Sequence, residues 1–247
     1  LSRRFNYRQL ARPAPAGMKR PSPQSSVDGG NFGPWSSAIA IITDRASGSS
    51  TCHLPAEIAP WLLVSDAVTA SDSANLIRCG VTHVINVAGA DCDTSAAARE
   101  AGAAYLRLDA QDRADYALLR HHWDEAWGFI ERARYDVKRS AVVLVHCVQG
   151  VNRSGLVAAS ALMLGDRICL VDAVQRIKRA RGTLLYNKGF RRQLVEFAHE
   201  KGLLGPRPFA TPGACDAVER ATANDSSDST PSHRLSRCDS AVGATSA

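Results

Sequence analysis

Short apolar runs alternate with longer amphipathic stretches between residues 54 and 204 of the chain. The apolar runs are rich in β-branched residues, which is typical of strands buried on both faces. They predict strands at residues 61–65, 82–88, 104–109 and 141–146. Stretches with apolar positions at helical spacing predict helices at residues 69–79, 94–102, 116–135, 154–164, 170–181 and 188–202. Because the strands and helices alternate, we predict an α/β fold with a mostly parallel central sheet flanked by helices.

Both ends of the chain lack such a pattern. Residues 1–53 are rich in Pro, Ser, Gly and Arg, and residues 205–247 are rich in Ser, Thr, Ala and Asp. Segments of this composition bury too little apolar surface to offset the entropy lost on ordering. We therefore predict one folded domain at residues 54–204 between a disordered basic N-terminal tail and a disordered C-terminal tail.

The net charge of +6 is unevenly distributed. Residues 1–50 contain seven basic and two acidic residues, whereas residues 51–204 are nearly neutral. A nearly neutral domain argues against nucleic acid as a specific partner. The Arg-rich start resembles an organellar transit peptide, which would be the alternative to a cytoplasmic or nuclear location. No run of apolar residues reaches the length of a membrane span.

Residues 146–155 (HCVQGVNRSG) carry the clearest chemical signal. They follow the apolar strand at 141–146 and precede the apolar helix at 154–164. A loop in this position opens onto a helix N-terminus, where unpaired backbone N–H groups and the helix dipole attract anions. Residues 148–153, which we call the phosphate loop, are therefore predicted to bind a phosphate group.

The side chains around this loop could perform chemistry on that phosphate. A helix N-terminus stabilises the thiolate of Cys147, which is the nucleophilic form of the thiol. Arg153 could hold two phosphate oxygens, Ser154 could donate a hydrogen bond to sulfur, and Gly150 would allow the backbone to curl. Burial of Cys147 as an ordinary core residue is the alternative, but the fixed offsets of these neighbours favour a nucleophile.

The segment 146–155 matches the HCxxGxxRS signature of the cysteine-dependent protein phosphatases. Other parts of the chain resemble the small atypical members of the dual-specificity group, namely residues 57–66, 81–88, 105–108 and 186–194. This resemblance implies that residues 54–204 are a dual-specificity phosphatase catalytic domain acting on phosphotyrosine, phosphoserine and phosphothreonine through a phosphocysteine. It also implies phosphoprotein substrates, with protein kinases as candidates, and neither a metal nor another cofactor.

The resemblance assigns roles to individual residues. Cys147 would be the nucleophile, and Ser154 would assist departure of its thiolate. The phosphate would be bound by the residues of the loop, which are Val148, Gln149, Gly150, Val151, Asn152 and Arg153. His146 would support the loop and the thiolate through its hydrogen bonds. Asn86 would tie the neighbouring strand to the phosphate loop.

A general acid must protonate the leaving oxygen. Residues 109–116, which we call the acid loop, follow the strand at 104–109 and contain three aspartates. The resemblance places the acid at Asp112, seven residues after Tyr105, with Asp109 as the second candidate. Asp115 looks like the N-cap of the next helix.

One residue departs from the family pattern. Most dual-specificity phosphatases carry Ser or Thr before the signature arginine, whereas this chain has Asn152. The loop of cysteine-type RNA 5′-triphosphatases has a similar Asn, so RNA triphosphatase activity is the main alternative. The uncharged loop residues Val148, Gln149 and Val151 argue against strongly anionic substrates such as triphosphates and phosphoinositides. A catalytically inactive phosphate-binding module is a third interpretation, which the presence of cysteine, arginine and acid together disfavours.

The remaining charged and thiol residues add little. Seven cysteines show no spacing typical of zinc ligands, and a required thiolate indicates a reducing compartment such as the cytoplasm or nucleus. The basic residues between 176 and 192 are interpreted mainly as a solvated helix face, and the alternative is that they flank the active site and attract phosphopeptides.

Overall fold

The computed structural model describes residues 32–44, 54–135 and 140–208. Its centre is a five-stranded sheet with the order β1-β2-β5-β3-β4. The strands are β1 (Ala56–Ala59), β2 (Leu62–Ser65), β3 (His83–Asn86), β4 (Ala104–Arg107) and β5 (Val143–His146). Only β1 is antiparallel to its neighbour, and the other pairs are parallel. The predicted α/β fold with a mostly parallel sheet is therefore confirmed.

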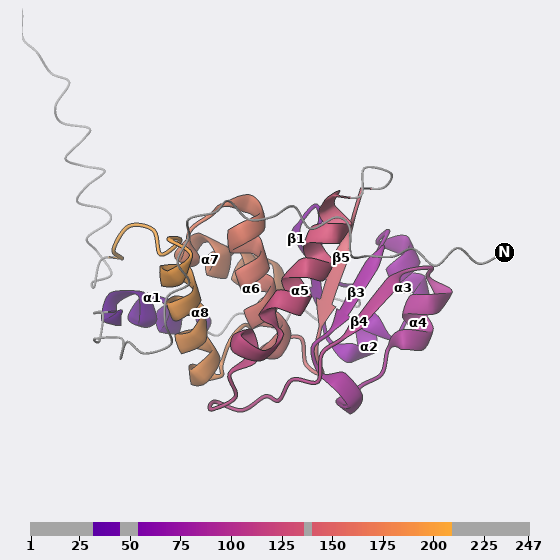
Figure 1. The fold of residues 1–247 in the computed structure, drawn as a ribbon, viewed down its shortest axis with the longest axis horizontal. Coiled ribbons are helices and arrows are strands. Elements are labelled where there is room, and N and C mark those ends of the chain that lie inside the picture. Colours follow the sequence, from indigo (N-terminus) through magenta and orange to yellow (C-terminus); the bar gives the residue numbers. More distant parts are fainter. Residues whose placement is uncertain (1–31, 45–53, 136–139, 209–247) are drawn as a thin grey trace, which may run out of the picture. The chain divides into compact units, whose positions relative to one another are not determined.

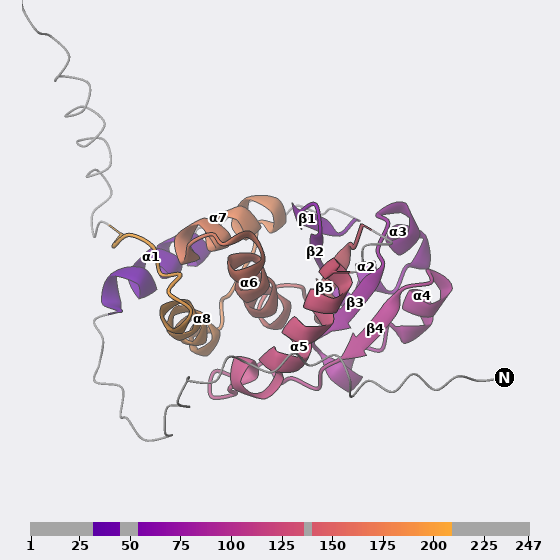
Figure 2. The ribbon, with the colours of Figure 1, turned by 45° about the horizontal axis from the view of Figure 1, so that its top comes forward.

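Helices cover both faces of this sheet (Figures 1 and 2). Helices α5 and α6 pack over β2, β5 and β3 on one face, and α3 and α4 cover the other face beside β4. The described helices are α1 (Gly33–Asp44), α2 (Ala67–Ala70), α3 (Ser73–Arg78), α4 (Ser95–Glu100), α5 (Leu118–Tyr135), α6 (Arg153–Asp166), α7 (Leu170–Arg181) and α8 (Lys188–Glu200).

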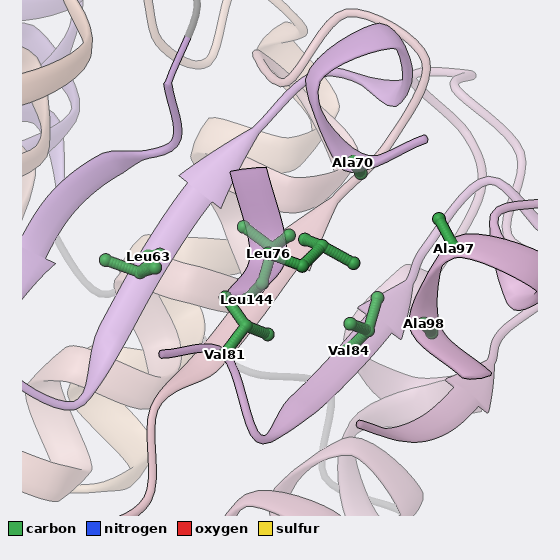
Figure 3. Close-up of a cluster of buried hydrophobic side chains, with 8 residues drawn as sticks. All are labelled: Leu63, Ala70, Leu76, Val81, Val84, Ala97, Ala98 and Leu144. Atoms are coloured by element: carbon green, nitrogen blue, oxygen red, sulfur yellow. The ribbon is translucent and has the colours of Figure 1, made fainter. Parts of the chain in front are cut away.

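The apolar core is built on the central strand β5 and its two neighbours, β2 and β3. Leu63, Val84 and Leu144 stand side by side on β2, β3 and β5 and point to the same face. Leu76 from α3 and Ala98 from α4 pack against them (Figure 3). All residues of β5 are buried, which explains the continuous apolar run in the sequence.

Two local features differ from the predicted elements. The helix predicted at 69–79 is split into α2 and α3, because Asp72 interrupts it and accepts a hydrogen bond from the backbone N of Ala74 at 2.9 Å. The strand β1 was not predicted as a separate element. It pairs with β2 across the turn at Pro60 and Trp61.

The predicted N-terminal tail is wrong for residues 33–44, which form α1. This helix packs against α7 and α8, and Ile39 is completely buried. Lys178 donates a hydrogen bond to the Thr43 carbonyl (3.2 Å), and the Trp35 indole donates one to the Leu204 carbonyl (3.2 Å). Averaged composition hid this helix because its apolar residues are embedded among Pro, Ser and Gly.

The remainder of the predicted tails, at residues 1–31, 45–53 and 209–247, lies outside the described part of the chain. Within the part that the structure describes, no helix is both long and apolar enough to span a membrane.

Candidate active site

The phosphate loop connects the end of β5 to the start of α6 and has its carbonyl groups turned outward. The backbone N of Ala67 donates to the Val148 carbonyl (3.1 Å), and the backbone N of Leu185 donates to the Val151 carbonyl (3.1 Å). The C=O and N–H of a peptide group point in opposite directions. Outward carbonyls therefore direct the loop amides toward the interior of the loop, where an anion would bind.

Arg181 holds the middle of the loop from outside. Its guanidinium donates to the carbonyls of Gln149 (3.2 Å) and Gly150 (3.5 Å) and forms an ion pair with Asp66 (3.2 Å). Burial alone would raise the pKa of Asp66, but hydrogen bonds from Thr69 and the charge of Arg181 lower it below its ordinary value. Arg181 is therefore a fixed structural cation, and its interpretation as part of a solvated face was wrong.

Cys147 lies directly before the phosphate loop and is only 2% exposed. Its Sγ accepts a hydrogen bond from the backbone N of Gly150 at 3.2 Å and lies 3.3 Å from the Oγ of Ser154. Gly150 has a φ of 68°, and a Cβ atom there would come within 2.5 Å of the Ser65 carbonyl oxygen. Only glycine fits this position, so the tight curl around the sulfur depends on it.

Arg153 points back toward the same opening from the first turn of α6. Its Nη1 donates to the Asp91 carboxylate (3.0 Å) and to the Ala110 carbonyl (3.1 Å). Its Nε is buried and has no hydrogen-bond partner among the described residues. A buried guanidinium donor without a partner is costly, and an anion in the loop would satisfy it.

His146 is fully buried below the loop. Its Nε2 and the Thr94 Oγ1 are 2.8 Å apart and share a hydrogen bond. Burial lowers the pKa of His146 to about 4, although the Cys147 backbone and Asp66 act weakly in the opposite direction. His146 is therefore neutral at pH 7 and brings no positive charge to the sulfur, so its contribution is packing and its bond to Thr94.

Asn86 is also buried, but its side chain does not reach the phosphate loop. Its amide nitrogen donates to the Gly89 carbonyl (3.0 Å) and to the Tyr105 hydroxyl (2.9 Å), and its oxygen accepts from the backbone N of Ala88. The predicted tie to the phosphate loop is wrong. Asn86 instead shapes the turn that presents Asp91 to Arg153.

Asp112 lies beside the phosphate loop and is held there by two asparagines. One carboxylate oxygen accepts from the Asn152 Nδ2 at 3.1 Å, and the other accepts from the Asn187 Nδ2 at 2.9 Å. Asn187 also caps helix α8, since its oxygen accepts from the backbone N of Gly189 (3.0 Å). Three segments that are distant in sequence therefore meet at this carboxylate.

The other two aspartates of the acid loop form ion pairs instead. Arg107 donates to Asp109 at 2.9 Å and lowers the pKa of that carboxyl below its ordinary value. Arg113 does the same for Asp115 at 2.6 Å. Of the three aspartates of the acid loop, Asp112 is the one that bonds a side chain of the phosphate loop, Asn152, which favours Asp112 as the acid. The predicted N-cap at Asp115 is wrong, because α5 begins at Leu118.

Four further residues of this site were missed by sequence reasoning. Asp91 bonds Arg153, and Thr94 bonds His146. Arg181 bonds carbonyls of the phosphate loop, and Asn187 bonds Asp112. Asn187 had a usable signal, because an Asn directly before a predicted helix, here 188–202, indicates an N-cap.

Residues 62–200 match the family described as the dual specificity phosphatase catalytic domain. The chain belongs to this family. It is thus a dual-specificity protein phosphatase, a hydrolase of the protein tyrosine phosphatase superfamily that acts on phosphoproteins, as its sequence predicted. The comparisons do not add support for the RNA triphosphatase alternative.

Known dual specificity phosphatases show how far the likeness extends. Dual specificity protein phosphatase 26 of Bos taurus is 34% identical over 150 residues, which cover 60% of this chain and 69% of the relative. Dual specificity protein phosphatase 13B of Mus musculus is 36% identical over 146 residues, covering 56% and 69%. The crystal structure of human DUSP28 superposes with a TM-score of 0.51 at 28% identity, covering 60% of this chain and 95% of that one.

Proposed function

We propose that this phosphatase hydrolyses phosphotyrosine, phosphoserine and phosphothreonine through a covalent phosphate on Cys147. The observation that carries the proposal is the convergence at one helix N-terminus of the Cys147 sulfur, the inward-facing amides and the Arg153 Nε, which no described residue bonds. A nucleophile and an anion cradle at the same place favour attack on a bound phosphate group.

In the first step the Cys147 thiolate attacks phosphorus, forming an S–P bond while the bond from phosphorus to the leaving oxygen breaks. Asp112 transfers its proton to that oxygen, so the leaving group departs as a neutral alcohol or phenol. The phosphate-loop amides and Arg153 stabilise the charge on the three phosphate oxygens that do not leave.

In the second step water attacks the phosphocysteine. The Asp112 carboxylate removes a proton from the water, a new O–P bond forms and the S–P bond breaks. The Ser154 hydroxyl, 3.3 Å from the sulfur, donates a hydrogen bond to the departing thiolate. Inorganic phosphate then leaves, and Asp112 is protonated again.

The surroundings of the loop support protein substrates. Val148 is 41% exposed and Tyr186 is 50% exposed, so neutral and partly apolar side chains border the opening. Such a rim favours a phosphorylated side chain on a polypeptide over a polyanion, which would call for more cations. The need for a reduced thiol supports a cytoplasmic or nuclear location.

The Cys147→Ser variant tests this proposal. This variant should still bind a phosphotyrosine peptide. Its phosphatase activity should be about ten-thousandfold lower than that of the wild type, because a serine hydroxyl is far less nucleophilic than a thiolate. Acid quenching of the wild-type protein during turnover of labelled peptide should trap labelled phosphocysteine. Residual activity near the wild-type level would contradict the mechanism. Faster release of γ-phosphate from triphosphorylated RNA than from phosphotyrosine peptide would favour the alternative.

A further inference from the structure

Asn152 occupies the N-cap position of α6 but does not cap the helix. Asparagine is among the preferred N-cap residues because its side-chain oxygen usually accepts from an amide of the first turn. Here the side chain makes no such bond. The Asn152 side chain therefore does not stabilise the start of α6 by capping it.

Both ends of the Asn152 amide are bonded outside the helix. Its Nδ2 donates to the Asp112 carboxylate (3.1 Å), and its Oδ1 accepts from the backbone N of Asn187 (3.1 Å). Asn187 in turn donates to the other oxygen of Asp112 (2.9 Å). The three residues form a closed ring of hydrogen bonds that joins the phosphate loop, the acid loop and the start of α8.

Only an amide side chain suits this ring. It presents a donor and an acceptor on separate atoms, so one residue can bond a carboxylate on one side and a backbone N–H on the other. A serine or threonine hydroxyl has a single oxygen on a shorter side chain. Replacement of Asn152 by serine would therefore shorten the reach toward Asp112 and open the ring.

We propose that Asn152 is a positioning residue that holds Asp112 over the phosphate loop for proton transfer. This inference rests on the proposed role of Asp112 as general acid. Residues 111–115 of the acid loop are all exposed, although the Ala114 backbone packs closely on Gly189 of α8. The Asp112 side chain itself is oriented toward the phosphate loop by its hydrogen bonds from Asn152 and Asn187.

The role predicts a specific kinetic signature. A misplaced acid slows departure of leaving groups that need a proton, but has little effect on leaving groups that depart as stable anions. Phenyl phosphate has a poor leaving group and 2,4-dinitrophenyl phosphate has a good one. Loss of Asn152 should therefore steepen the dependence of kcat/KM on leaving-group basicity without weakening phosphate binding.

The variants Asn152→Ala and Asn152→Ser test this signature. We expect kcat/KM, which reports formation of the phosphocysteine and not its later hydrolysis, to fall about tenfold for phenyl phosphate and less than about twofold for 2,4-dinitrophenyl phosphate. The inhibition constant of inorganic phosphate should stay within about twofold of the wild-type value, which shows that the loop is intact. Gln175→Ala, which removes an amide side chain on α7, should change none of these values.

A double-mutant cycle with Asp112→Asn separates the inference from the function on which it rests. If Asn152 acts through Asp112, adding Asn152→Ala to Asp112→Asn should cause no further loss with phenyl phosphate. Equal losses on both substrates, additive effects in the cycle or no effect at all would overturn the inference. If Asp112→Asn itself leaves the leaving-group dependence unchanged, the assignment of the acid fails instead.

Discussion

The phosphate loop and the acid loop lie next to each other but are held by different kinds of contact. Carbonyls of the phosphate loop accept hydrogen bonds from β2–α2, α7 and the segment before α8, and Gly150, Val151 and Arg153 are buried. The acid loop is exposed over residues 111–115. Its ties to the phosphate-loop side are bonds from Arg153 to Ala110 and from two asparagines to Asp112.

This difference corresponds to the work proposed for each loop. Groups that stabilise charge on the phosphate must be oriented before the substrate arrives, because reorganisation during the reaction would cost the energy they supply. A proton donor must reach one oxygen, and its effect depends on how badly that oxygen needs a proton. Substitutions in the phosphate loop should therefore slow the hydrolysis of every substrate. Substitutions in the acid loop should slow substrates with poor leaving groups more than those with good ones.

The largest expected effect is at Gly150. In Gly150→Ala the added methyl group would meet the Ser65 carbonyl at a positive φ, so we expect kcat/KM to fall about a thousandfold for good and poor leaving groups alike. Gly102 has the same φ of 68° but no atom within 4 Å of a Cβ. Gly102→Ala should lower the free energy of unfolding by about 1 kcal/mol and leave kcat/KM unchanged. An active Gly150→Ala enzyme would show that the loop is not as rigid as its contacts indicate.

The next effect compares two aspartates of the acid loop. Asp112→Asn should lower kcat for phenyl phosphate about a hundredfold, whereas Asp109→Asn should change it by less than about twofold. The physical reason is that Asp109 is paired with Arg107, while Asp112 is directed at the phosphate loop. Steady-state rates of both variants on two leaving groups check this. A larger loss in Asp109→Asn would move the acid to that residue.

A smaller effect concerns the contribution that His146, buried below the phosphate loop, makes to the free energy of unfolding. The pKa of His146 is 6.5 when exposed and about 4 in the fold, so between these values the unfolded chain binds the extra proton. The contribution of neutral His146 to stability is therefore complete above pH 6.5 and is lost as the pH falls toward 4.

Denaturant unfolding at pH 7 and pH 5 measures this contribution. The wild-type protein should lose about 2 kcal/mol more than His146→Gln between the two pH values. His121→Gln, at an exposed position on α5, should behave like the wild type. Equal pH dependence in wild type and His146→Gln would show that His146 is not buried in its neutral form.

The smallest expected effect is that of Asp44 in α1, which is connected to the phosphate loop through Arg191 and Leu185. Arg191 pairs with Asp44 of α1 and donates to the Leu185 carbonyl, and the Leu185 amide bonds the Val151 carbonyl. Asp44→Ala should lower the free energy of unfolding by less than about 1 kcal/mol, because Asp44 is largely exposed. Its small effect on kcat should be equal for good and poor leaving groups. Discrimination between the two would link α1 to the acid loop as well.

The phosphate loop could be predicted from sequence because its determinants are local. Cys147, Gly150 and Arg153 stand close together between a buried strand and a helix, and each has a role that follows from its residue type. The β5–α6 connection, the fold class and the family therefore followed from the pattern.

The acid loop and its surroundings could not be predicted in the same way, because their determinants are long-range. Asp112 is bonded to residues 40 and 75 positions away, and only the spacing from Tyr105 that the family resemblance implies favoured it over Asp109. Helix α1, the buried Lys178 and the half-buried Arg181 were misinterpreted for a related reason. Their partners lie on other elements, so composition alone made them look like tail or solvated surface.

The central position of β5 has a consequence for the order of folding. β5 pairs with β2 on one side and β3 on the other, and both partners are distant in sequence. Closing such long intervals is slow compared with forming helices. During refolding, recovery of phosphatase activity should therefore lag behind the return of the helical circular dichroism signal. Until both neighbours have docked, the chain carries its reactive sulfur without the cradle that makes it a phosphatase.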